Sequence, residues 1–200
     1  MPKRDSDRRT QRTLQALRSA FVGLVLTRGY ESITIGDIVR AADVGRSTFY
    51  LHFPSKEALL RESLKVPSSS LAACVDQTAA PRLLMPLLEH FREQRAVNRV
   101  FFVDPIRSIW VKSLAATIEP RLVRAVRSGG LQLVLPSPLS SLVLAEMQIA
   151  LITHWLIGRS SLKPELVASA LIANTNALVR GNPSIGANHP GEVRDAPAWE

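Results

Sequence analysis

A short run of hydrogen-bonding side chains has the chemistry to contact nucleic-acid bases. Arg46 carries a planar guanidinium, Ser47 and Thr48 carry hydroxyls, and Tyr50 carries a phenol. Arginine pairs with guanine through two parallel hydrogen bonds, and hydroxyls bond to the edges of several bases. On a helix, Arg46, Ser47 and Tyr50 share one face, opposite the apolar Phe49. The spacing therefore predicts a polar helix face that is anchored from behind.

Two short helices and a turn must position this face. Thr34 is a suitable N-cap, and Asp37 follows three residues later, as in a capping box. The segment 43–45 interrupts the helical pattern, and 46–52 is predicted as the next helix. A preceding helix with an apolar stripe is predicted to end at Gly29. This order is that of a helix-turn-helix, whose second helix enters the major groove.

The run TIGDIVRAADVGRSTFYLHFPSKEAL, from Thr34 to Leu59, resembles the N-terminal DNA-binding domain of the TetR family of transcriptional regulators. The resemblance extends over about residues 10–62. It implies phosphate contacts and groove contacts at these positions: Thr34 and Lys56 at phosphates, Arg46, Ser47 and Thr48 facing the groove, and Tyr50 and His52 at the DNA backbone or a base edge.

Two residues depart from the pattern of that family. Asp43 stands where a turn glycine is usual, and Gly45 stands where a capping serine is usual. Aspartate adopts a left-handed backbone less readily than glycine, and glycine has no side chain to cap the helix. We expect both changes to weaken the turn without abolishing the motif.

The remainder of the chain is also helical by pattern, so the predicted fold class is all-α, with a three-helix helix-turn-helix domain and a C-terminal helical domain. A break is expected at 67–70. A loop is expected at 131–138, where a strand without a partner stays possible. The predicted organisation is a basic N-terminal arm at 1–9, a DNA-binding domain at 10–65, a helical effector-binding and dimerisation domain at 66–180, and a disordered tail at 181–200.

Aromatic and polar residues of the second domain could line a pocket for a small apolar or aromatic ligand. The candidates are Phe91, Phe102, Trp110 and Gln148. For each single residue, packing in the core is the competing interpretation. The last two helices could pair with their copies in a four-helix bundle. The candidate contacts of this dimer interface, which the resemblance also implies, are Leu151, Trp155, Leu166 and Ala170.

Composition excludes several other classes of protein. The chain has 200 residues, 25 basic and 17 acidic side chains and a net charge of +8, which favours a polyanionic partner. One cysteine, Cys74, excludes an internal disulfide, and the four histidines lack the spacing of metal ligands. No phosphate-binding loop or catalytic constellation is evident. The sequence thus predicts no enzyme activity, no cofactor and no metal. The apolar segment 142–157 is too short and too polar for a membrane span.

These features predict a cytoplasmic, ligand-responsive repressor that binds a palindromic operator as a homodimer. Two alternatives stay open. One is a regulator that is controlled by a protein partner without a small-molecule effector. The other is a ligand-binding or enzymatic helical protein whose DNA-binding head is vestigial. The basic residues of the arm form either a minor-groove contact or a solvated tail. They are Lys3, Arg4, Arg8, Arg9 and Arg12.

Overall fold

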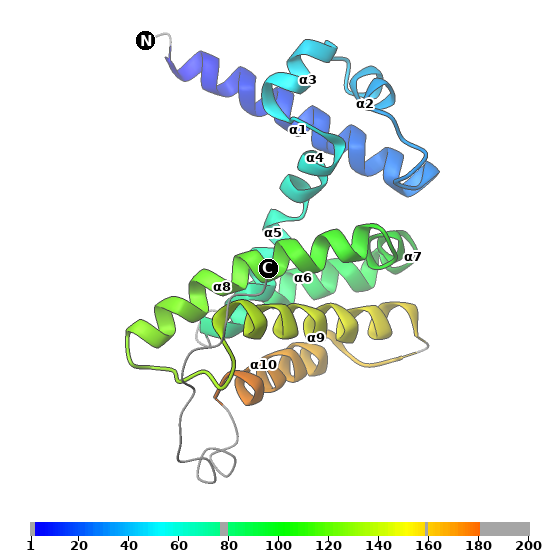
Figure 1. Cartoon of the computed structure of the whole chain (residues 1–200). Helices are drawn as coiled ribbons and strands as arrows, with labels where there is room; N and C mark the ends of the chain where they lie inside the picture. Colours follow the sequence, from blue (N-terminus) through cyan, green and yellow to red (C-terminus); the bar gives the residue numbers. More distant parts are fainter. Residues whose placement is uncertain (1–2, 77–79, 159, 181–200) are drawn as a thin grey trace, which may run out of the picture.

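A computed structural model describes residues 3–76, 80–158 and 160–180 of the chain. These residues form helices and loops without any strand, which confirms the all-α prediction. Of the predicted loop at 131–138, residues 131–136 are a loop and 137–138 already belong to the next helix. The predicted tail at 181–200 lies outside the described residues. Figure 1 shows the N-terminal helices, one of them long, above a layer formed by the helices of the second half of the chain. The helices are α1 (Lys3–Arg28), α2 (Ile35–Ala41), α3 (Arg46–His52), α4 (Lys56–Ser63), α5 (Lys65–Ala72), η1 (Ala73–Asp76), α6 (Ala80–Glu93), α7 (Arg95–Asn98), η2 (Arg99–Phe102), α8 (Ile106–Arg127), α9 (Ser137–Ile157) and α10 (Pro164–Arg180).

The helix α1 is the support on which α2, α3 and α4 rest. Its residues Leu17, Phe21 and Val25 are fully buried, as their three- and four-residue spacing predicts. The helix ends before Gly29, whose φ of 76° is the left-handed conformation of a helix C-terminus. At its other end α1 begins at Lys3. The expected separate arm at 1–9 is therefore, from residue 3 onward, a continuation of this helix.

The chain changes direction at Leu64, not at the predicted break at 67–70. Leu64 is the C-cap of α4 and the N-cap of α5. Pro67 lies in the first turn of α5. The N–H groups of a first turn have no acceptor within the helix, so a proline there costs no hydrogen bond. The proline is thus compatible with a helix, and α5 begins directly after Leu64.

The second domain packs α5, α6 and α10 around the long pair α8 and α9. Trp110 of α8 lies at its centre, and its indole N–H donates to the Ser68 hydroxyl of α5 over 3.2 Å. Phe91 and Phe102 pack against the Trp110 ring, with centroid distances of 6.1 and 4.9 Å. Buried side chains of both domains form one continuous apolar core.

The side chain of Arg95 holds the C-terminal end of α9. Its guanidinium donates to the carbonyl oxygens of Leu156 (2.7 Å), Trp155 (3.1 Å) and Ser160 (3.3 Å), and also to that of Gly158. Carbonyl groups at a helix end have no partner within the helix. Arg95 supplies that partner from α7, which fixes the connection between α9 and α10.

Among the described helices, α9 alone is long and apolar enough to cross a membrane. Within its most apolar stretch 44% of the residues are buried inside the protein. Buried core helices have the same length and composition, and α9 packs lengthwise on α8 (Figure 1). We therefore describe α9 as a core helix.

Candidate DNA-binding interface

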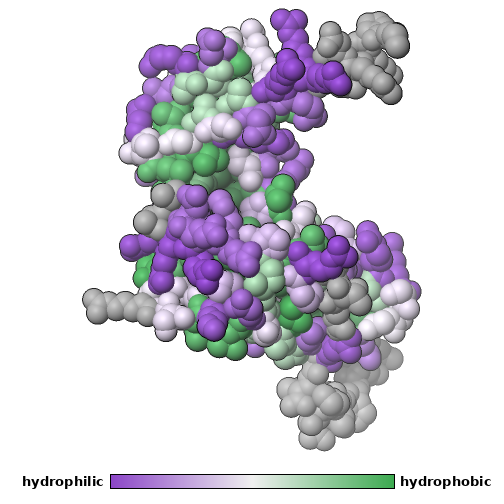
Figure 2. Space-filling view, turned by 180° about the vertical axis from the view of Figure 1, so that it is seen from behind, coloured by the Kyte–Doolittle hydropathy of each residue, from purple (hydrophilic) through white to green (hydrophobic). Residues whose placement is uncertain are grey.

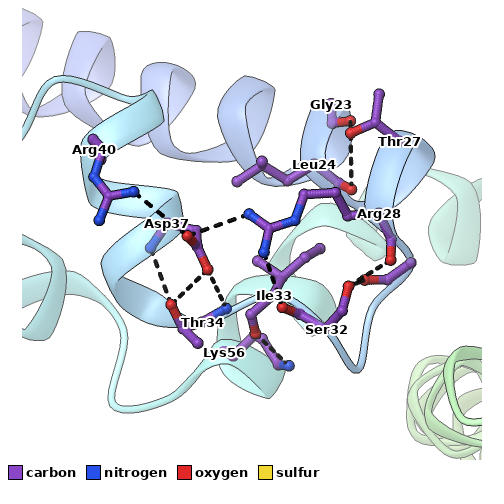
Figure 3. Close-up of polar contacts among 11 residues, drawn as sticks. Gly23, Leu24, Thr27, Arg28, Ser32, Ile33, Thr34, Asp37, Arg40 and Lys56 are labelled. Atoms are coloured by element: carbon purple, nitrogen blue, oxygen red, sulfur yellow. Dashed lines mark hydrogen bonds and ion pairs between the residues drawn. The ribbon is translucent and has the colours of Figure 1, made fainter.

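A network of polar contacts fixes the start of α2 (Figure 3). The Asp37 backbone N–H donates to the Thr34 hydroxyl over 3.2 Å, and the Asp37 carboxylate accepts from the Thr34 N–H over 3.0 Å. This is the predicted capping box. The Arg28 guanidinium of α1 lies 3.2 Å from the same carboxylate. The Thr34 hydrogen bonds, and then Arg28, hold the pKa of Asp37 well below its usual range. The carboxylate therefore joins α2 to α1.

The turn between α2 and α3 contains both residues that depart from the family pattern. Asp43 has a φ of 53°, so it adopts the left-handed conformation that the usual glycine would adopt. Gly45 is the N-cap of α3 and provides no side-chain hydrogen bond. The helix-turn-helix geometry is thus retained with both residues in place, and the expected weakening of the turn stays a prediction. The α3 N-terminus keeps free N–H groups that a phosphate oxygen can bond.

The helix α3 has an inward face and an outward face. Phe49 is completely buried, as predicted, and its ring centroid lies 5.9 Å from that of Phe53. Arg46, Ser47 and Tyr50 are exposed on the outward face. The Arg46 guanidinium lies 6.0 Å from the centroid of the Tyr50 ring, so these two side chains are neighbours. The structure thus exposes three of the four side chains whose types suggested base contacts on this face, and Thr48 lies elsewhere.

Thr48 and His52 line a different surface, a groove of about 610 Å³ between α3 and the first turns of α1. Across the groove lie Arg9, Thr10 and Thr13 of α1. The groove thus combines the Arg9 guanidinium and the His52 imidazole with several threonine hydroxyls, all of which can donate to phosphate oxygens, and with one carboxylate, that of Asp43.

Lys56 differs most from its predicted role. Its ammonium donates to the carbonyl oxygens of Tyr30 and Ile33, each over 2.8 Å, and lies 4.2 Å from the centroid of the Tyr30 ring. Burial lowers the pKa of this ammonium. Lys56 therefore ties α4 to the loop before α2, and only its third N–H is left for a phosphate.

One residue of the outward face was missed by the sequence reasoning. Leu51 follows Tyr50 on α3 and is 80% exposed. An apolar side chain in a major groove contacts the methyl group of thymine. The helical spacing that placed Arg46 and Ser47 outward also places Leu51 there, so the periodicity was a sufficient signal.

Comparison with known proteins agrees with this geometry. Residues 20–63 match the family described as "Bacterial regulatory proteins, tetR family". This domain is the DNA-binding domain of the TetR family. The chain is 42% identical over 60 residues to the uncharacterized HTH-type transcriptional regulator YxbF of Bacillus subtilis strain 168, a match that covers 30% of this chain and 16% of YxbF. It is 23% identical over 161 residues to YhgD, an uncharacterized regulator of the same type and organism, covering 72% of this chain and 84% of YhgD.

Solved structures of this family share the whole fold. A TetR transcriptional regulator from Streptococcus agalactiae 2603V is 25% identical, with a TM-score of 0.52 over 86% of this chain and 98% of that one. FadR of Thermus thermophilus, a TetR-family repressor solved in complex with lauroyl-CoA, is 22% identical, with a TM-score of 0.52 over 94% of this chain and 99% of that one. The TetR fold therefore extends beyond the helix-turn-helix.

The second domain of this chain contains a cavity of about 430 Å³. Phe91 and Trp110 line it, as expected for an effector site. Phe102 lies behind them in the core, 1% exposed, and Gln148 is fully buried with its amide N–H donating to Thr175 over 3.1 Å. Neither is among the lining residues. The structure thus keeps two of the four predicted residues in the walls of the cavity.

The predicted dimer contacts also separate into two groups. Leu166 of α10 is 55% exposed, and Leu151 and Ala170 are half-buried. Trp155, in contrast, is buried within its own chain, and its indole N–H donates to the Leu162 carbonyl oxygen over 2.9 Å. We correct the prediction accordingly: Trp155 secures the end of α9 and is not available to a partner.

Proposed function

We propose that this TetR-family protein is a sequence-specific regulator of transcription that binds double-stranded DNA through α3. The observation that supports this most directly is the exposed Arg46–Tyr50 pair on a helix whose opposite side is fixed by Phe49. A rigid helix that presents a guanidinium, hydroxyls and a phenol reads base edges in the major groove. The groove between α1 and α3 contacts the flanking phosphates.

We propose a homodimer formed through α9 and α10. Apolar side chains are exposed along both helices and the loop between them, and a second copy would cover them. They are Leu139, Leu142, Val143, Ile157, Leu162, Leu166 and Leu178. A two-fold axis places two α3 helices in successive major grooves, roughly 34 Å apart, when the half-sites are palindromic.

We further propose that the protein is a repressor whose DNA affinity depends on a small-molecule effector in the 430 Å³ cavity. A ligand shifts the equilibrium between conformations of the dimer towards the one that binds it better. In that conformation the distance between the two α3 helices would not match the distance between the half-sites of the operator. The shared fold supports this idea, because the Thermus thermophilus repressor was solved with lauroyl-CoA. The proposed place of action is the cytoplasm, and the proposed role is regulatory and not catalytic.

Selection of bound sequences from random duplexes tests whether the protein prefers a sequence. Sedimentation of the complex measures its mass and so the number of chains that bind. The expected result is a palindromic consensus bound by two chains. A single unpaired half-site bound by one chain would contradict the homodimer. Recovery of no preferred sequence by folded protein would contradict the proposed function itself.

A further inference from the structure

The 430 Å³ cavity lies where the DNA-binding domain meets the second domain. Val22 of α1 and Leu64, at the bend between α4 and α5, form one side of it, and Trp110 of α8 forms another. Figure 2 shows how narrow the protein is between its two domains. A ligand in this position touches both domains at once, so its chemistry matters for any regulation that the proposed function invokes.

Among the charged residue types, the walls of the cavity carry no carboxylate, ammonium or guanidinium group. Among its 14 lining residues, all within the described chain, there is no aspartate, glutamate, lysine or arginine. Phe91, Phe101 and Trp110 provide aromatic surfaces, and Pro86 and Leu87 of α6 add aliphatic ones. A cation that entered this space would find no carboxylate, and an anion would find only the His90 imidazole. An ion packed against the apolar walls would lose hydration without a fixed partner of opposite charge, which is unfavourable.

Most polar groups near the cavity are already engaged in the fold. The Ser63 hydroxyl donates to the Leu59 carbonyl oxygen over 2.9 Å, and the Asn98 amide N–H donates to the His90 carbonyl oxygen over 3.4 Å. The Trp110 indole N–H is bonded to α5. The His90 imidazole and the Ser70 hydroxyl have no hydrogen bond to another part of the described chain. These two groups can each bond a ligand.

We infer that the cavity binds an uncharged, largely aromatic molecule that carries one hydrogen-bonding group, directed to His90 or Ser70. The inference rests on the proposed function only for its regulatory consequence. The binding step depends on the cavity alone. Because the ligand packs between Val22 and Trp110, its presence is linked to the position of α1 relative to α8.

Calorimetric titration of the full chain, without DNA, tests the inference with three probes of nearly equal shape. These are neutral 2-naphthalenemethanol, anionic 2-naphthoate and cationic 2-naphthylmethylammonium. We expect the neutral alcohol to bind with a Kd below about 1 mM, and at least about tenfold more tightly than either ion. Equal or tighter binding of an ion, or no binding of the alcohol below that concentration, overturns the inference.

Variants locate the binding in this cavity. Ser70→Phe fills the space and is expected to abolish binding of the alcohol, whereas Ser69→Phe, on the exposed side of α5, leaves it unchanged. His90→Leu replaces an exposed side chain, so the fold persists. It is expected to lower the affinity for the alcohol at least about threefold if the alcohol's hydroxyl bonds to His90. Binding that neither Ser70→Phe nor His90→Leu reduces overturns the assignment.

A parallel measurement of affinity for the selected duplex separates this inference from the proposed function. If the neutral probe binds the cavity and duplex affinity stays the same, the ligand site stands and effector control fails. If duplex affinity responds only to a charged molecule, effector control stands and the inference about ligand charge fails.

Discussion

Replacing Lys56 with alanine shows whether its ammonium stabilises the fold or contacts DNA. Its Nζ atom donates to two carbonyl oxygens, of Tyr30 and Ile33, each over 2.8 Å, and lies 4.2 Å from the Tyr30 ring centroid. A hydrogen bond from a charged donor contributes about 1.5–3 kcal/mol, and an exposed cation–π contact about 0.5–1 kcal/mol. Water reaches this half-buried site and replaces part of both. We expect Lys56→Ala to lower the free energy of unfolding by about 2–3 kcal/mol.

Thermal unfolding followed by circular dichroism measures this loss. For a chain of this size each kcal/mol lowers Tm by about 2–4 °C, so the expected decrease is about 4–12 °C. Lys112→Ala removes an exposed lysine of α8 and serves as the control, with a change of about 1 °C or less. Lys56→Met retains the aliphatic chain and isolates the effect of the ammonium.

The salt dependence of DNA binding completes the test. A lysine that neutralises a phosphate contributes about 0.9 to the slope of log affinity against log salt concentration. We expect the slope of Lys56→Ala to change by less than this. If Lys56→Ala has the Tm of the wild type and its salt slope falls by the full contribution of one phosphate, the structural role is refuted. The phosphate contact that the resemblance implies would then stand.

Three further perturbations address the interface and its support. The folded state lowers the pKa of Asp37, so its carboxylate stabilises the fold above the unfolded value of about 3.9, and this contribution disappears as the pH falls below it. Unfolding curves at a series of pH values should show that the free energy of unfolding of Asp37→Asn falls less on acidification than that of the wild type. The same fall in both proteins would contradict the argument. Arg95→Ala, which frees four carbonyl groups around the end of α9, should cost about 2–4 kcal/mol in denaturant unfolding, against about 0.5 kcal/mol or less for exposed Arg92→Ala. Leu51→Ala should leave Tm within about 1 °C and weaken binding to the selected duplex by about 1 kcal/mol, and undiminished affinity would remove Leu51 from the contact surface.

Local chemistry was sufficient to predict most of the helix-turn-helix. The capping box at Thr34, the end of α1 at Gly29 and the burial of Phe49 each depend on residues within one helical turn of one another. Spacing rules describe such interactions directly. The contacts with DNA stay predictions, because they depend on a partner.

The contacts that spacing did not predict are those set by distant parts of the chain. Lys56 is bonded to a loop 23 to 26 residues away, and Trp155 is covered by the segment that follows α9. Gln148 pairs with Thr175 from a different helix. A side chain's periodicity shows which face it occupies, but not whether that face meets solvent, a cavity or another helix. The break near Pro67 was misplaced for a local reason, because a proline in the first turn does not end a helix.

The central claim, that the outward face of α3 reads base sequence, is tested most directly with Arg46→Ala. Fluorescence anisotropy compares this variant, the wild type and the control Arg82→Ala, at an exposed position of α6, on the selected duplex and on a scrambled duplex of equal length. We expect Arg46→Ala to lose about 1–3 kcal/mol of affinity, roughly 5–150-fold, on the selected duplex and about twofold or less on the scrambled one. Equal losses on both duplexes, or no loss on either, would contradict the claim.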